Sequence, residues 1–137
     1  MKTWYTDIKQ MHGKYGVSQW ISNAMKDDPE KVKKFLEFRM NFLTEEYNET
    51  IKAYNEKDAE EIIDGLIDIC VIAIGTLEAF DVDADKAWRE VHRANMNKTP
   101  GVKPERPNPL GLPDLIKPEG WTAPSHKDNH GNLPNAL

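Results

Sequence analysis

Residues 45–68 read EEYNETIKAYNEKDAEEIIDGLID, and this stretch decides the fold of the chain. Its carboxylates recur at spacings of three and four residues, which places them on single faces of α-helices. The first face carries Glu45, Glu46 and Glu49, and the second carries Glu61, Asp64 and Asp68. A short polar turn at residues 55–58 separates the two helices, and helices joined by so short a link pack antiparallel. The sequence therefore predicts two acidic faces that meet.

Apolar residues at helical spacing extend this prediction to the rest of the chain. Residues 4–11 form a short amphipathic opening, and we expect helices over residues 17–25, 29–54, 58–80 and 83–97. Asp28 before Pro29 is a typical helix start, because an acidic cap precedes a proline in the first turn. Gly65 and Gly75 lie inside a predicted helix, where each costs up to about 1 kcal/mol relative to alanine. We therefore expect another helix to approach closely at these glycines.

The composition changes after Thr99, since eight of the nine prolines lie from Pro100 onward. Proline lacks the backbone N–H that helices and sheets require, so we expect neither in this segment. Trp121 indicates that part of the segment docks on the helices. The predicted fold class is all-α: an antiparallel four-helix bundle in residues 1–98, followed by a Pro-rich extended C-terminal tail in residues 99–137 that wraps it.

Charge and hydropathy exclude several classes of protein. A net charge of −5 argues against nucleic-acid binding, which needs a basic face. Cys70 is the single cysteine, so no internal disulfide can form, and we expect its thiol to be buried. The longest apolar stretch, residues 69–77, is far short of the ~20 residues that span a membrane, and the amino terminus lacks a signal-peptide pattern. We expect a cytoplasmic protein without nucleic-acid or membrane partners.

Asp64 and Asp68 stand among isoleucines, where an ionised carboxylate costs several kcal/mol unless something compensates it. The two groups are then protonated, paired with a basic residue, or ligands of a cation. Oxygen ligands without a cysteine pair or a histidine cluster select a hard ion, Mg²⁺ or Mn²⁺, over zinc. The histidines are scattered and show no ligand spacing. Because magnesium in proteins commonly also contacts substrate phosphates, the pattern points to phosphate chemistry.

Hydrogen-bond donors gather at the end of the last predicted helix, namely Arg93, Asn95, Asn97 and Lys98. Beside a metal site, the two cations can hold triphosphate oxygens, and the two amides can read base edges. The alternative is that Arg93 and Lys98 only stabilise the carboxyl end of the helix through its macrodipole.

These motifs resemble the all-α nucleoside triphosphate pyrophosphohydrolases, which include MazG-like enzymes, dimeric dUTPases and phosphoribosyl-ATP pyrophosphohydrolase. The signature of that superfamily is Glu-Glu-x-x-Glu on one helix and Glu-x-x-Asp on the next. Glu45-Glu46-x-x-Glu49 and Glu61-x-x-Asp64 match it. Residues 64–68 and 91–98 are similar to a compact, single-domain MazG-like subgroup that is common in phages.

One position departs from many relatives, because Gly65 stands where they carry a glutamate three residues before the last aspartate of the motif. Two assignments of the second-helix ligands follow. In the first, Glu61 and Asp64 bind metal. In the second, Asp64 and Asp68 bind metal, and Glu61 supports them.

The resemblance implies hydrolysis of a ribo- or deoxyribonucleoside triphosphate, between its α and β phosphates, to a monophosphate and pyrophosphate. It implies Mg²⁺, with Mn²⁺ as the alternative ion, and an enzyme that acts on nucleotide pools as a homodimer or homotetramer. The metal ligands would be Glu46, Glu49, Glu61, Asp64 and Asp68. The catalytic residues would be Glu45, as general base, and Glu46. Arg93 and Lys98 would clamp phosphate, while Asn95 or Asn97 would read the base or sugar.

Two other classes of protein share part of this acidic pattern. A carboxylate-bridged di-iron bundle also uses glutamates on antiparallel helices, but it needs Glu-x-x-His on two of them, and the chain has no such motif. A non-catalytic helical adaptor with a merely solvated acidic face is the alternative function. The adaptor would be indifferent to Mg²⁺.

Overall fold

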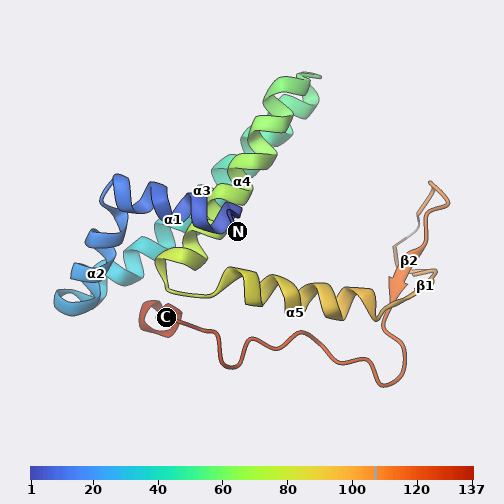
Figure 1. Ribbon diagram of the computed structural model, residues 1–137. Coiled ribbons are helices and arrows are strands. Elements are labelled where there is room, and N and C mark those ends of the chain that lie inside the picture. Colours follow the sequence, from blue (N-terminus) through green and yellow to red (C-terminus); the bar gives the residue numbers. More distant parts are fainter. Residues whose placement is uncertain (107) are drawn as a thin grey trace. The chain divides into compact units, whose positions relative to one another are not determined.

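The computed structural model describes residues 1–106 and 108–137. Within these residues the chain forms five α-helices, two short strands and one 3-10 helix (Figure 1). The elements are α1 (Trp4–Lys14), α2 (Val17–Asp27), α3 (Pro29–Asn55), α4 (Ala59–Ala79), α5 (Ala84–Met96), β1 (Thr99–Gly101), β2 (Asp114–Ile116) and η1 (Leu133–Ala136). The mostly helical prediction is confirmed. The described residues form two compact units, Met1–Ala84 with His130–Leu137 and Asp85–Asn129.

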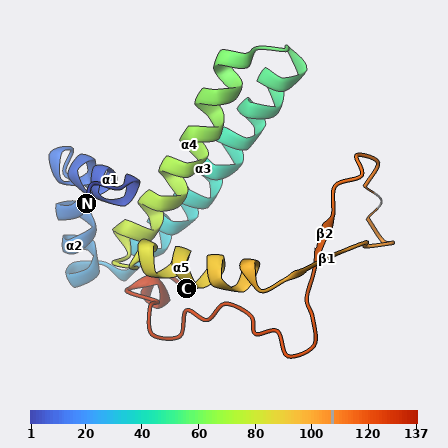
Figure 2. The same ribbon diagram turned by 45° about the vertical axis from the view of Figure 1, so that its right-hand side comes forward.

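A long hairpin of α3 and α4 is the centre of the first unit. Asp28 caps α3 by accepting a hydrogen bond from the Lys31 backbone N–H at 3.3 Å, and Pro29 occupies the first turn. Asp58 caps α4 in the same way, by accepting a hydrogen bond from the Glu61 backbone N–H at 3.1 Å. The two helices run side by side, and their joining turn projects beyond α1 and α2 (Figure 2). The predicted antiparallel neighbours are therefore present.

Gly65 allows α4 to approach α3 closely. A Cβ atom at this position would overlap Thr50 Oγ1 and would lie 3.2 Å from Thr50 Cβ. Thr50 is buried on α3, and its hydroxyl donates to the Glu46 carbonyl at 2.7 Å. The expected close approach is confirmed, and it lies one helical turn from the acidic residues.

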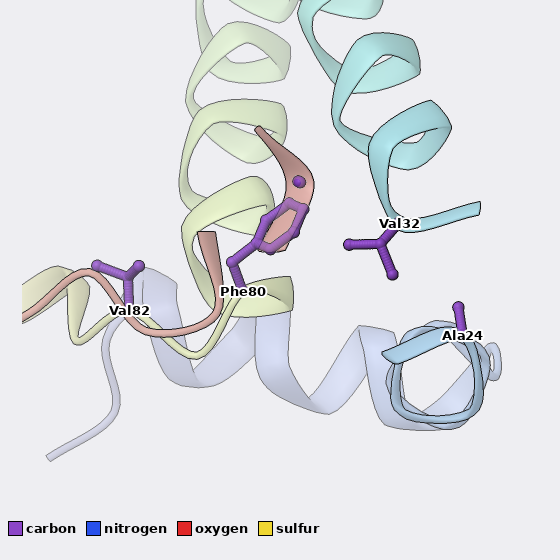
Figure 3. Packing of buried hydrophobic residues seen from close by; sticks show 5 residues of the cluster. Ala24, Val32, Phe80 and Val82 are labelled. Atoms are coloured by element: carbon purple, nitrogen blue, oxygen red, sulfur yellow. The ribbon is translucent and has the colours of Figure 1, made fainter. Parts of the chain in front are cut away.

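The core of the first unit gathers at the other end of the hairpin. Phe80 is fully buried in the centre of a cluster, with Val32 and Ala24 on one side (Figure 3). Ala136 of η1 joins this cluster, and the Asn132 backbone N–H donates to the Phe80 carbonyl at 2.7 Å. The last eight residues therefore belong to the first unit.

The second unit contains a small sheet, so the expectation that residues 99–137 hold neither helices nor a sheet was wrong. Strands β1 and β2 pair antiparallel, with Pro100 opposite Leu115. A two-stranded ribbon has only edge strands, where a proline without an N–H is tolerated. The buried Asp114 carboxylate braces the hairpin by accepting from the Lys103 backbone N–H at 3.0 Å and from Arg106 at 2.6 Å. The Pro-rich segment thus gains polar contacts that its composition does not reveal.

The predicted division at residues 98 and 99 rests on composition and stays a prediction. In the structure, α5 is grouped with the segment that follows it. Across the described ranges, none of the helices combines the length and apolar content needed to cross a membrane.

Candidate active site

A cavity of about 700 Å³ lies in the first unit, between the α3–α4 hairpin and the helices α1 and α2. One face of α3 supplies side chains at spacings of four, three and four residues: Phe35, Arg39, Phe42 and Glu46. Helix α4 supplies Asp68, Val71 and Ile72, and the amino-terminal helices and their link supply His12, Tyr15 and Trp20. The cavity therefore combines aromatic walls with a few charged groups.

The acidic faces of α3 and α4 lie against each other along this cavity. Partial burial raises the pKa of Glu46 above its ordinary value, and the charges of Asp68, Glu49, Glu45 and Asp64 raise it further. Burial also raises the pKa of Asp68, together with the charges of Asp64 and Glu49. These influences cross between the two helices, so carboxylates from both helices share one electrostatic field. Glu46 on α3 and Asp68 on α4 both line the cavity, so the predicted meeting of the two faces is confirmed for these two residues.

Glu61 takes a smaller part in this field than Asp64. Among the described residues, the charges that raise the pKa of Glu46 come from its own helix and from Asp64 and Asp68. Glu61 lies exposed in the first turn of α4, where its backbone N–H donates to the Asp58 cap. Asp64 and Asp68 are thus the residues of α4 whose charges act on Glu46, and the choice between the two ligand assignments on α4 stays a prediction.

The donor chemistry of this cluster fits a hard dication, because it consists of carboxylate oxygens at a place of concentrated negative charge. Burial is the main cause of the raised pKa values of Glu46 and Asp68, and repulsion between neighbouring carboxylates adds to it; a cation would relieve that repulsion. Over residues 1–106 and 108–137, no three acidic, histidine or cysteine side chains form a group that could hold a metal ion. The ligand set named from the sequence therefore stays a prediction.

A buried polar relay lies at the other end of the cavity, and the sequence did not reveal it. His12 is 2% exposed, and its Nδ1 contacts the Glu78 carboxylate. Its Nε2 lies 3.4 Å from Arg39 Nη2. A guanidinium can only donate, so Nε2 accepts from Arg39 and Nδ1 carries the proton that is donated to Glu78. The relay joins α4, α1 and α3.

Gly75 is the one sequence signal of this relay. A Cβ atom there would lie 3.1 Å from Arg39 Nη1 and 3.3 Å from His12 Nε2. The expected close approach at Gly75 is confirmed, although it involves polar side chains from α1 and α3. The partners are 27 and 66 residues apart in sequence, so no local spacing could have identified them.

The predicted phosphate and base contacts belong to the second unit. Arg93 donates to Glu90 at 2.9 Å, to Thr122 Oγ1 at 3.2 Å and to the Ala123 carbonyl at 3.3 Å. This pairing raises the pKa of Arg93 and lowers that of Glu90. Arg93 thus fastens residues 122–123 to α5, and Glu90 holds Ser125 by accepting from its backbone N–H at 3.2 Å.

Trp121 docks on the same helix. Its Nε1 donates to the Ala94 carbonyl at 2.7 Å, and the ammonium groups of Lys98 and Lys117 lie 5.6 and 5.1 Å from its ring centre. Lys98 is half-buried, whereas Asn95 and Asn97 are exposed. The structure gives Arg93 and Lys98 contacts within this unit, and their roles towards a substrate stay predictions.

Two antiparallel helices whose carboxylates face each other beside an aromatic cavity define the class of the all-α nucleoside triphosphate pyrophosphohydrolases. The family described as phosphoribosyl-ATP pyrophosphohydrolase matches residues 15–95, which is more than half of the chain. The chain belongs to this family, a member of the MazG-like superfamily. A search of curated proteins gave no match.

Proposed function

We propose that the protein is a Mg²⁺-dependent nucleoside triphosphate pyrophosphohydrolase, which converts a ribo- or deoxyribonucleoside triphosphate and water to the monophosphate and pyrophosphate. The family supports a pyrophosphohydrolase at the level of reaction class, and enzymes of this family typically use Mg²⁺. The observation that carries the proposal is the shared field of Glu46 on α3 and Asp64 and Asp68 on α4.

The acidic cluster supplies both the metal ligands and the base of this reaction. Glu46, Glu49, Asp64 and Asp68 would hold Mg²⁺, and Glu61 would support them from the preceding turn. When bound, the ion neutralises phosphate oxygens and acidifies the attacking water. Glu45 is exposed, precedes Glu46 by one residue and lies about 100° from it around the helix, so it would be free to take a proton from that water as general base. Glu46 is therefore a ligand, and Glu45 is the group that moves a proton.

Arg93 and Lys98 would clamp the phosphates in this proposal, and Asn95 or Asn97 would contact the base or sugar. For Arg93 this role requires an exchange of partners, because the guanidinium now holds Glu90 and the Thr122–Ala123 backbone. Lys98 would need only to leave the face of Trp121, a contact worth about 0.5–1 kcal/mol at an exposed site. Lys98 is the more accessible clamp.

The second candidate substrate is phosphoribosyl-ATP, which the matched family names. It carries the same α–β phosphoanhydride, so the carboxylate cluster serves either substrate. The two differ in the group attached to the adenine, and only a direct comparison of turnover separates them.

Self-association is part of the proposal, as a homodimer or homotetramer. It is supported by apolar side chains that the distal half of the hairpin leaves in solvent. Ile63 is 63% exposed and Leu66 is 52% exposed on α4, and Tyr47 and Tyr54 are exposed on α3. Exposed apolar surface of this kind is typical of a protein interface. Light scattering coupled to gel filtration tests it, and a monomer at micromolar concentration would refute it.

Pyrophosphate release tests the proposed reaction. The substrates are the ribo- and deoxyribonucleoside triphosphates and phosphoribosyl-ATP, each with Mg²⁺, with Mn²⁺ and with EDTA, and the products are resolved by chromatography. We expect metal-dependent formation of monophosphate and pyrophosphate, and its loss in Asp68→Asn with unchanged helical circular dichroism. Asp85→Asn, an exposed aspartate on α5, is the matched control. No turnover with either metal would leave the adaptor function as the better account.

A further inference from the structure

The cavity has two chemically different ends, and both lie on α3. Glu46 and Asp68 line one end, while Arg39 and His12 line the other. Arg39 precedes Glu46 by seven residues, which corresponds to about 10 Å along a helix. The side chains between them are apolar, namely Phe42 on α3 and Val71 and Ile72 on α4. A ligand with its phosphates at the carboxylate end therefore extends its other end towards Arg39.

The relay holds the Arg39 guanidinium in a fixed orientation. His12 accepts one of its N–H groups and is itself fixed by Glu78 on α4. The guanidinium carbon also lies 5.0 Å from the centre of the Phe35 ring. Guanidinium has five N–H donors in a planar fork, and within the described residues His12 is the acceptor found for it. Donors therefore remain for a ligand in the cavity that Arg39 lines.

Glu78 makes this end of the cavity suited to a neutral group. Its charge opposes the lowering of the Arg39 pKa that burial causes, so the carboxylate acts as the counter-charge of the guanidinium. The charges of the Arg39 and Glu78 side chains sum to zero. A phosphate would gain little from such a pair, whereas a neutral acceptor still receives directed N–H donors. The relay therefore fits a polar nucleobase edge better than an anion.

Aromatic side chains provide the surface on which a base stacks. Trp20 lies 5.6 Å from Phe35 between ring centres, and Phe38 lies 5.7 Å from Phe42. All four line the cavity. Stacking on aromatic residues tolerates any base, because every base has a π-face. Discrimination between bases must then come from the polar group at this end of the cavity.

Resting on the function proposed above, we propose that Arg39 is the base-reading residue and selects a nucleobase with two neighbouring acceptors, which leaves the sugar to Asn95 or Asn97. Guanine offers N7 and O6, and cytosine offers N3 and O2. Adenine places an N6 amino donor beside its N7 acceptor, which a donor-only guanidinium cannot satisfy. Uracil and thymine alternate acceptor and donor in the same way. His12 and Glu78 are positioning residues that hold the fork.

The test compares kcat/KM for the four triphosphates with Mg²⁺ in the wild type and in two variants. Wild type is expected to favour GTP or CTP over ATP and UTP by about 5- to 150-fold, the range measured for a good bidentate contact to a base. Arg39→Gln removes the charge and the fork. Arg39→Lys keeps the charge but loses the bidentate fork, so it should lose most of the preference as well. Lys34→Gln, an exposed cation on the same helix, is the control and should keep it.

Analogues test the same contact without any mutation. If guanine is preferred, 7-deaza-GTP lacks N7 and should lose most of the advantage over ATP. If cytosine is preferred, 3-deaza-CTP should do the same. If the analogue and its parent nucleotide have the same kcat/KM, the inference is overturned. This outcome can be read even if neither Arg39 variant folds. A wild type that lacks base preference or favours ATP, UTP or phosphoribosyl-ATP, or a variant that slows all four substrates equally, overturns it too and leaves the pyrophosphohydrolase proposal intact.

A binding measurement separates this inference from the proposed reaction. Calorimetric titration with the four nucleoside monophosphates, in the absence of metal, reports base recognition alone. If no triphosphate is hydrolysed but GMP or CMP still binds in an Arg39-dependent way, the inference stands and the proposed reaction fails. If the four monophosphates bind equally, or with a preference that Arg39→Gln leaves unchanged, the inference fails.

Discussion

Replacing Gly65 with alanine measures how tightly the two acidic helices are packed. The added Cβ would overlap Thr50 Oγ1 and press on Thr50 Cβ at 3.2 Å. The hydroxyl cannot simply rotate away without losing its 2.7 Å hydrogen bond to the Glu46 carbonyl. Overpacking of this kind costs about 1–3 kcal/mol, and we expect the upper end here. Alanine regains about 1 kcal/mol of helix propensity, which leaves a net loss of about 2 kcal/mol.

Urea and thermal unfolding of Gly65→Ala measure this loss. A decrease of about 2 kcal/mol corresponds to a drop in melting temperature of roughly 6–10 °C for a domain of this size. Gly13→Ala is the matched control, because it lies in α1 with nothing within 4 Å of its Cβ and should be neutral or stabilising. Removing the obstacle with Thr50→Ala should make Gly65→Ala less costly in a double-mutant cycle. A variant as stable as the wild type would refute the close approach of α3 and α4.

Three further predictions concern the electrostatics, the core and the second unit. The pKa values of Glu46 and Asp68 are raised in the folded protein. At a pH just above the ordinary pKa of a carboxyl group, the folded protein therefore binds more protons than the unfolded chain. The metal-free protein should accordingly lose stability as the pH rises through this range. Urea unfolding in the presence of EDTA should show that the free energy of unfolding falls less steeply with pH in Asp68→Asn than in the wild type. Equal pH dependence in the two proteins would argue against the shared field. Phe80→Ala should cost about 3–5 kcal/mol in the same assay, since the ring is fully buried, and a cost below 1 kcal/mol would remove it from the core. Trp121→Phe removes the indole N–H that donates to the Ala94 carbonyl, a hydrogen bond worth about 1 kcal/mol. Hydrogen exchange of the backbone amides in residues 117–125 should therefore become about fivefold faster. Unchanged exchange rates would contradict the docking of Trp121 on α5.

The acidic cluster carries an electrostatic cost in the absence of a cation. Like charges at a spacing of four residues destabilise a helix by about 0.2–0.5 kcal/mol, as for Asp64 and Asp68. Both helices bring further carboxylates into the same field. A chain selected only for stability would avoid this arrangement. Its retention is understandable if a cation normally neutralises it.

The helices and the facing carboxylates could be predicted because both depend on local spacing. The prediction 29–54 differs by one residue from α3, and 58–80 encloses α4. The reason is that caps and periodicity act within a few residues of each other, as Asp28 and Asp58 do. The β1–β2 ribbon was missed because its support is not local. Asp114 braces it from 8 and 11 residues away, and composition gave no sign of that contact.

The sequence by itself determined the two acidic helices and their antiparallel link, because these follow from residue type and helical period; the hard cation inferred from the same residues stays a prediction. Only the tertiary structure brought Glu78, His12 and Arg39 together. Their hydrogen bonds join three helices across 27 and 66 residues, a distance over which sequence spacing carries no information. Packing of α1 against the hairpin decides that arrangement, and with it the polarity of the cavity end that the base would occupy.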